Sequence, residues 1–193
     1  MTVYTSNKMN NPLANKILFL RVQNKDHEAY GQFYDIYVDK IYRFVFFKVN
    51  SAEDAKDLTS EVFLKTWQYI KNDKAIKNLN AFVYMVARNC IIDFYRERSR
   101  KDDNEEFINE AHMAIAGDNP LLKQIKQTEM AEVLKALARL KDEYREAIIL
   151  HYLNELSPKE MSQILDKSPG AVRVLLYRAL NALKSAISNK NKT

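Results

Sequence analysis

Apolar residues recur at three- and four-residue spacing along most of this chain, which predicts helices over nearly its whole length. Four helices are expected in the first hundred residues. The first covers Pro12 to about Gln23, and the second covers His27 to about Val49. Ser51 is expected to cap a third helix, which ends near Ile70. The polar loop Lys71–Asn80 follows. Asn80 is expected to cap a fourth helix, which ends near Arg100.

The helical pattern weakens after residue 101, and the sequence from Gly117 to Pro120 signals a loop. It returns with one helix from about Gln124 to Leu140 and another from about Asp142 to Leu153. With only 3 glycines and 4 prolines in 193 residues, the chain is predicted to be all-α. The expected domains are residues 11–100 and 121–189, joined by an acidic linker at 101–120.

Two Ser-Pro pairs about one short helix apart predict a helix-turn-helix in the second domain. Ser157 is an N-cap with Pro158 at the first helical position, and Glu160 completes a capping box. Ser168 and Pro169 repeat the start signal after a turn of three or four residues. Such a unit commonly places its second helix in a DNA major groove.

The second helix of this unit has two distinct faces. One stripe is apolar and must pack inward, namely Val172, Leu175, Leu176, Ala179, Leu180 and Leu183. The opposite face offers Arg173 for a guanine edge and Arg178 for phosphates. The full DNA-facing set is Ser168, Gly170, Ala171, Arg173, Val174, Tyr177 and Arg178. The alternative is a helical hairpin whose basic face is merely solvated.

The fourth helix mixes aromatic and basic residues, including Arg88, Arg96 and Arg100 with Tyr84 and Tyr95. Bases of single-stranded DNA stack on exposed rings while arginines bind its phosphates. The pattern therefore favours single-stranded DNA as a partner. In the alternative interpretation, the tyrosines belong to the core and the arginines are only solvated.

Charge is distributed in blocks. Residues 11–101 carry 16 Lys and Arg against 11 Asp and Glu. Residues 102–119 carry 6 acidic residues and no base, and residues 120–193 carry 13 basic against 8 acidic residues. Two basic blocks suit a polyanionic partner, although two solvated domains with a soluble linker would give the same pattern.

Other classes of function find little support. No apolar run reaches the roughly 20 residues of a membrane span, and the N-terminus has no signal-peptide core, so a cytoplasmic protein is expected. The single Cys90 reads as a buried thiol. The chain lacks a phosphate-cradling glycine loop, a Ser/His/Asp set and metal-ligand spacing of its histidines. We therefore expect no enzyme, no cofactor, no metal and no small-molecule substrate.

Three segments in order resemble the sigma-70 family of RNA polymerase initiation factors, and in particular its small extracytoplasmic-function (ECF) group. SAEDAKDLTSEVFLKTWQYI is similar to the polymerase-binding helix of region 2, and NAFVYMVARNCIIDFYRERSR to its promoter-melting helix. LKDEYREAIILHYLNELSPKEMSQILDKSPGAVRVLLYRALNAL resembles region 4. The resemblance spans about residues 13–187, and it implies two helical domains.

The resemblance also implies roles for individual residues. Core RNA polymerase would be bound by Asp54, Asp57, Leu58, Glu61 and Phe63. The −10 element, melted or at its duplex edge, would be bound by Asn78, Asn80, Tyr84, Arg88, Asn89, Asp93 and Arg96, with Asn78 and Asn80 facing a flipped base. The −35 element would be read by Arg173, Val174, Tyr177 and Arg178.

Further partners are implied in the same way. Promoter DNA would be bound both as duplex and as melted strand, and an anti-sigma protein is an expected inhibitor. The acidic linker would thread channels that RNA later occupies. The chain departs from the family at Val174 and Leu175, where many members have a hydroxyl and an arginine, so its −35 contacts are expected to be fewer or more apolar.

A helix-turn-helix repressor or activator with a helical sensor domain is the competing hypothesis. Such proteins usually dimerise on paired half-sites. A sensor domain has no need of the arginine-aromatic helix, and no dimer seam is evident in the sequence. Both observations favour the initiation factor.

Overall fold

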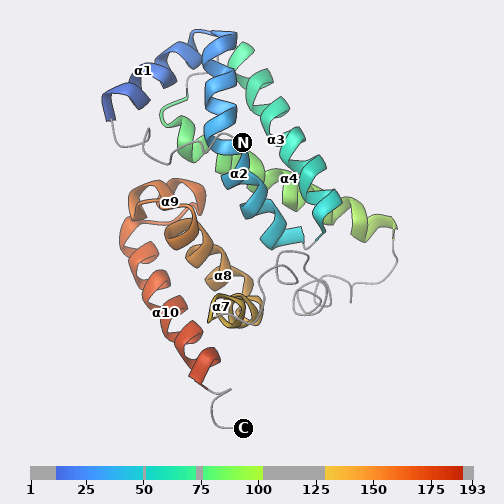
Figure 1. Ribbon diagram of the computed structural model, residues 1–193, viewed down its shortest axis with the longest axis vertical. Coiled ribbons are helices and arrows are strands. Elements are labelled where there is room, and N and C mark those ends of the chain that lie inside the picture. Colours follow the sequence, from blue (N-terminus) through green and yellow to red (C-terminus); the bar gives the residue numbers. More distant parts are fainter. Residues whose placement is uncertain (1–11, 50, 73–75, 102–128, 189–193) are drawn as a thin grey trace.

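The protein is described by a computed structural model over residues 12–49, 51–72, 76–101 and 129–188. Every regular element in these ranges is helical (Figure 1), which confirms the all-α prediction. The expected acidic linker lies outside the described residues, apart from Lys101. Among the described helices, none is long and apolar enough to cross a membrane.

The first half of the molecule consists of α1 (Pro12–Gln23), α2 (His27–Val49), α3 (Ala52–Lys71) and α4 (Leu79–Lys101). Helix α2 packs against the other three, and α3 also packs against α4. Their buried stripes meet in an aromatic core that includes Phe33, Phe44 and Phe46. Helix α2 buries the face that carries its apolar repeat, whereas α1 buries Leu18 and Val22 and leaves Leu13, Ile17 and Leu20 exposed.

The starts of α3 and α4 show one success and one error of the capping predictions. Ser51 caps α3, and its Oγ accepts a hydrogen bond from the backbone N–H of Asp54. Helix α4 is capped by Asn78 rather than Asn80, because the Asn78 Oδ1 accepts from the N–H of Ala81 at 3.2 Å. Both asparagines suit an N-cap, and the chain uses the earlier one.

The second half consists of α7 (Glu129–Ala138), α8 (Asp142–Ile148), a π-helical turn η2 (Ile149–Leu153), α9 (Pro158–Ile164) and α10 (Pro169–Ser188). The predicted helix from Asp142 to Leu153 has the observed span, but its last turn is π-helical. The Asn154 N–H donates to the carbonyl of Ile149 at 3.0 Å, which is the five-residue step of a π turn. His151 Nδ1 and the Leu156 carbonyl, 2.7 Å apart, hold this turn against the following loop.

Three of the connections between helices use left-handed backbone without glycine. Lys25, Glu155 and Asp166 have φ values of 63°, 58° and 52°. Lys25 lies between α1 and α2, Glu155 precedes α9, and Asp166 lies between α9 and α10. This conformation costs a non-glycine residue on the order of 1 kcal/mol, so the helices on either side must fix the reversals.

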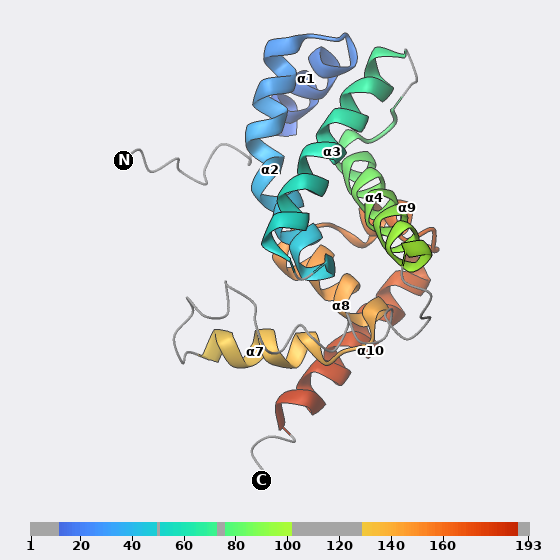
Figure 2. The same cartoon turned by 90° about the vertical axis from the view of Figure 1, so that its right-hand side faces the viewer.

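The two halves are packed against each other. Helix α9 packs against α4 (Figures 1 and 2). Lys48, near the end of α2, reaches Asp142 of α8. Figure 2 shows α10 extending away from the first half, on the far side of α8 and α9. The arrangement covers part of α4 and leaves one side of α10 open.

Candidate nucleic-acid interface

The helix-turn-helix consists of α9, a four-residue turn from Leu165 to Ser168, and α10. The predicted capping box is present. Ser157 Oγ accepts from the Glu160 N–H at 3.3 Å, and Glu160 Oε2 accepts from the Ser157 N–H at 2.9 Å. At the second start, Ser168 Oγ accepts from the Ala171 N–H at 3.2 Å. Each Ser-Pro pair therefore begins a helix, as predicted.

Helix α10 separates an apolar face from an open face. Val172, Leu175, Leu176 and Ala179 are buried against the other helices of the second half. Val174 is 50% exposed and Tyr177 is 68% exposed. The rest of the predicted −35 set is also exposed, namely Ser168, Gly170, Ala171, Arg173 and Arg178. We call these seven residues the α10 surface, and neither of its arginines forms an ion pair with a described residue.

The candidates of the −10 set are spread around α4. Asn89, Asp93 and Arg96 are exposed, and the last two approach each other at 3.7 Å. Tyr84 is fully buried, and its ring packs edge-on against Phe44 with centroids 5.6 Å apart. A base cannot stack on Tyr84 in this arrangement, so the structure places it in the core rather than at the DNA surface.

Tyr95 is also engaged within the protein. Its hydroxyl donates to the carbonyl of Lys48 at 2.6 Å and so joins α4 to the end of α2. Burial raises the pKa of both Tyr84 and Tyr95, so both phenols are neutral. For these tyrosines the structural alternative considered above is the correct one.

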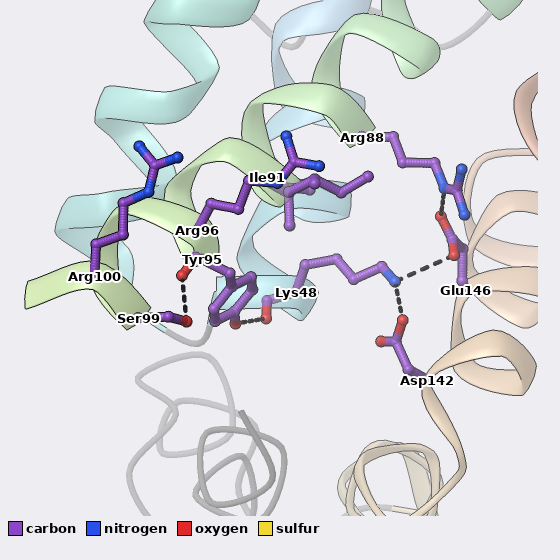
Figure 3. A pocket seen from close by; sticks show the side chains of 10 residues that line it. Lys48, Arg88, Ile91, Tyr95, Arg96, Ser99, Arg100, Asp142 and Glu146 are labelled. Atoms are coloured by element: carbon purple, nitrogen blue, oxygen red, sulfur yellow. Dashed lines mark hydrogen bonds and ion pairs between the residues drawn. The ribbon is translucent and has the colours of Figure 1, made fainter. Parts of the chain in front are cut away.

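Two more members of the −10 set face the second half of the molecule. Asn80 Nδ2 donates to Glu160 Oε1 of α9 at 2.7 Å. Arg88 Nε lies 3.3 Å from Glu146 Oε1 of α8 (Figure 3). The remaining member, Asn78, is the cap of α4.

A buried charge cluster accompanies the Arg88 contact. Lys48 Nζ lies 2.7 Å from Asp142 Oδ2 and 3.2 Å from Glu146 Oε2 (Figure 3). The side chains of Lys48 and Glu146 are only 8% and 5% exposed. Sequence reasoning missed this cluster, although Lys48 is a lone charge in the apolar run FVFFKV, and such a residue needs a buried partner.

The electrostatics of the cluster favour the ionised form of Asp142. Burial by itself raises the pKa of Asp142, but the charge and hydrogen bond of Lys48, together with Arg145, outweigh it and lower the pKa to about 2. Arg145 Nη2 donates to Asp142 Oδ1 at 2.9 Å. A pocket of about 530 Å³ lies beside the cluster, and its wall includes Ile91, Tyr95 and Arg100.

Helix α3 carries the residues expected to bind polymerase. Asp57 is exposed and Glu61 is half-buried, whereas Leu58 and Phe63 belong to the core. Leu64 was missed by sequence reasoning although it is 57% exposed. It follows Asp57 and Glu61 at helical spacing, so the three share one side of α3.

Other chemistry is sparse at this surface. Asp54 lies 3.8 Å from Arg98 of α4, and Lys65 pairs with Glu61 at 2.6 Å.

The single cysteine, Cys90, lies on α4. Burial raises the pKa of the Cys90 thiol, which is 1% exposed. The prediction of a plain buried thiol is therefore confirmed.

The two halves of the chain match two regions of one protein family. Sigma-70 region 2 matches residues 33–101, and Sigma-70 region 4 matches residues 130–183. The first match ends with α4, and the second extends from α7 into α10. The order of the matches is the order in which the sequence placed the two domains.

Curated relatives agree with these matches. The chain is 31% identical to the ECF RNA polymerase sigma factor SigM of Bacillus subtilis over 155 residues, which cover 80% of this chain and 92% of SigM. It is 29% identical over 166 residues to the ECF RNA polymerase sigma factor BldN of Streptomyces coelicolor. That alignment covers 84% of this chain but only 62% of BldN.

A solved structure shares the fold. It is the sigma factor RpoE in complex with the anti-sigma factor NepR from Bartonella quintana, with a TM-score of 0.65 and 21% identity. The alignment covers 82% of this chain and 96% of RpoE. The all-helical arrangement of the two halves thus has a counterpart among known structures.

Proposed function

The chain belongs to the ECF group of the sigma-70 family, and from that premise we propose how its two halves share the work of transcription initiation. As a sigma factor it directs RNA polymerase to promoters, and it is not an enzyme. The observation that carries the assignment of roles is the open α10 surface at the end of a properly capped helix-turn-helix. A helix presented in this way fits a major groove.

The second half, proposed to span residues 121–189, reads the −35 element. Arg173 presents two donors to the acceptor edge of a guanine, while Ala171 and Val174 contact thymine methyl groups. Arg178 binds phosphate, which sets the position of the helix without reading sequence. The small number of polar groups on this surface suits a helix that polymerase brings to its site.

The first half, proposed to span residues 11–100, binds the −10 element. We call Asn78, Asn80, Arg88, Asn89, Asp93 and Arg96 the −10 surface. Its amides suit the edge of a flipped base and its arginines suit the phosphates of a melted strand. Tyr84 is left out because it is buried.

Core polymerase docks on the exposed side of α3, through Asp57, Glu61 and Leu64. An apolar side chain that is 57% exposed and follows two acidic residues on the same side of the helix fits a partner that offers an apolar contact beside basic groups. Leu58 and Phe63 support this side from within the core, and Asp54 is held near Arg98.

Two further features complete the proposal. The protein acts in the cytoplasm, and an anti-sigma protein covers it when it is inactive, as NepR is a partner of RpoE. The segment 101–120 connects the halves, and its acidic residues occupy positively charged channels of the polymerase.

The experiment is reconstitution of transcription with core polymerase on promoters mapped after overexpression of the protein. Wild-type protein should produce defined start sites that core polymerase alone does not use. Leu64→Asp should abolish co-purification with core polymerase, whereas Leu13→Asp, at a similarly exposed leucine on α1, should not.

Two results would overturn the main parts of the proposal. Tight, dimeric binding of promoter duplex by the free protein, with no need for polymerase, would identify a conventional repressor or activator. Normal co-purification of Leu64→Asp would remove the docking surface from α3.

A further inference from the structure

The segment that leads into α4 is held by the end of α1. Gln23 Nε2 donates a hydrogen bond to the backbone carbonyl of Ile76, which is 53 residues away in the sequence. We propose that Gln23 is a positioning residue for the −10 surface and that Lys77, in the segment it holds, is a further contact to promoter DNA. This inference rests on the assignment of the −10 surface given above, to which neither residue was assigned.

The corner between α1 and α2 gives Gln23 a fixed starting point. Asp26 Oδ1 accepts from the Ala29 N–H at 3.0 Å, and Asp26 Oδ2 accepts from Arg21 Nε at 2.8 Å. The carboxylate thus ties the last turn of α1 to the first turn of α2, and Gln23 lies in sequence between its two partners. This corner lies at the same end of the first half as the end of α3 (Figures 1 and 2).

The segment that Gln23 holds is anchored on both sides of Lys77. Ile76 is 7% exposed and Leu79 is 1% exposed, so both side chains belong to the core. Asn78 Oδ1 caps α4 through its bond to the Ala81 N–H. Lys77 itself is exposed and forms no ion pair among the described residues. Its backbone is therefore fixed while its side chain is open to solvent.

The bond from Gln23 has a defined task in this segment. Ile76 lies outside any helix, so its carbonyl needs a partner from elsewhere in the chain. Gln23 supplies the donor. Without this amide the segment would keep its buried side chains but lose its tie to the α1–α2 corner. The expected result is a displacement of Lys77 and Asn78 rather than unfolding.

The place of Lys77 suits DNA that follows the −10 surface. Lys77 precedes Asn78 in the chain, and Asn78 starts the helix that carries the rest of that surface. An ammonium is a compact point charge that binds phosphate, and each phosphate it neutralises releases counterions. Lys77 therefore extends the basic part of the −10 surface beyond the start of α4.

The test of the positioning role compares Gln23→Leu with Asn24→Leu in holoenzyme reconstituted with core polymerase. Each variant replaces an exposed amide near the end of α1 by an apolar side chain, but of the two only Gln23 donates to the Ile76 carbonyl. Open-complex formation is measured on promoters with single changes in the −10 element. Promoters with single changes in the −35 element are the internal reference, and circular dichroism confirms that each variant is folded.

Gln23→Leu should reduce the preference between −10 sequences by at least about five-fold, near the lower end of the usual cost of one mismatched base pair. The preference between −35 sequences should stay unchanged, and Asn24→Leu should change neither. A loss of stability alone would lower activity on all promoters alike and keep their ranking. A Gln23→Leu variant with the wild-type −10 preference would therefore overturn the positioning role.

Lys77→Ala tests the DNA contact at an exposed side chain, where the core is not at risk. It should weaken holoenzyme binding at all −10 sequences and reduce the slope of log affinity against log salt by about one. Lys16→Ala, at an exposed lysine of α1, is the control and should leave the slope unchanged. An unchanged slope for Lys77→Ala would remove this residue from the DNA.

The double variant tests whether the two residues act together. Lys77→Ala should have a smaller effect in the Gln23→Leu background, because a displaced segment no longer places the ammonium at its phosphate. Additive effects would show that Gln23 does not act through this segment.

Arg88→Ala separates failure of this inference from failure of the −10 surface. If Arg88→Ala weakens promoter binding while Gln23→Leu and Lys77→Ala behave as wild type, the −10 surface stands and only the present inference is rejected. If none of the three variants changes use of the −10 element, the −10 assignment is rejected as well.

Discussion

Helices α4 and α10 carry the two proposed DNA surfaces, and they present them in opposite ways. The seven residues of the α10 surface are all exposed, whereas α4 is in contact with α2, α3 and α9. Two members of the −10 surface are held by carboxylates of the other half. One surface is therefore ready in the free chain and the other depends on where the second half lies.

The difference shows what fixes each surface. The α10 surface is the polar side of a single amphipathic helix, so its exposure is determined within one half of the molecule. The −10 surface depends on contacts between residues far apart in the sequence, such as Lys48 and Asp142, which are 94 residues apart. A partner that moves one half relative to the other therefore changes the exposure of the −10 surface and leaves the α10 surface unchanged.

The largest effect is expected when the buried side of α10 is damaged. Leu176, 7% exposed, lies next to Tyr177, 68% exposed. Leu176→Ala should lower the free energy of unfolding by about 2–5 kcal/mol, because it leaves a cavity in the core. Tyr177→Ala should change it by less than about 0.5 kcal/mol. Urea unfolding followed by circular dichroism measures both, and equal losses would show that the two sides of α10 are not distinct.

A smaller effect is expected at the α10 surface itself. Arg173→Ala should cost about 1–3 kcal/mol of discrimination at one position of the −35 element, because a bidentate contact to guanine is lost. Arg178→Ala should weaken all promoters alike, because phosphates carry no sequence. Holoenzyme binding to a set of −35 variants measures this. Uniform weakening by Arg173→Ala would place that residue at the backbone instead.

The capping box tests whether α9 is held by its own cap or by α4. Ser157→Ala should destabilise the protein by about 1 kcal/mol, because the Glu160 N–H loses its acceptor. The radius of gyration should not change, since the bond from Asn80 to Glu160 Oε1 remains. Ser185→Ala, at an exposed hydroxyl within α10, is the control and should be neutral. An expanded Ser157→Ala variant would mean that the cap and the contact are inseparable.

The smallest effect concerns acid. Because the folded chain lowers the pKa of Asp142 from 3.8 to about 2, this residue stabilises the folded form above pH 3.8. That stabilisation is lost as the pH falls from 3.8 toward 2. Asp142→Asn lacks it, so its thermal stability should depend less on pH in this window. Lys48→Gln should flatten the dependence in the same way, and a parallel curve for either variant would contradict the ion pair.

Much of the fold could be predicted because helix formation here is local. Apolar spacing gave α1 and α2 their observed bounds, and the two Ser-Pro pairs gave the starts of α9 and α10. The start of α4 was misplaced by two residues because Asn78 and Asn80 are both suitable caps. The π turn after α8 depends on the loop that it contacts, and no apolar period announces it.

The candidate surfaces were predicted unevenly for a physical reason. A helix that packs on one side, such as α10, shows its exposed face in the sequence. Helix α4 packs on several sides, so its aromatic residues could belong to a core or to a ligand site, and Tyr84 proved to be core. Leu64 was overlooked because an apolar residue beside a buried stripe looks like part of it.

The two oxygens of Glu160 face different parts of the molecule. Oε2 binds Ser157 within the helix-turn-helix, and Oε1 accepts from Asn80 across the boundary between the halves. Breaking the second bond leaves the first intact, so α9 keeps its start when the halves part. The helix-turn-helix can therefore move as a rigid body toward a distant promoter element, and this movement requires no refolding.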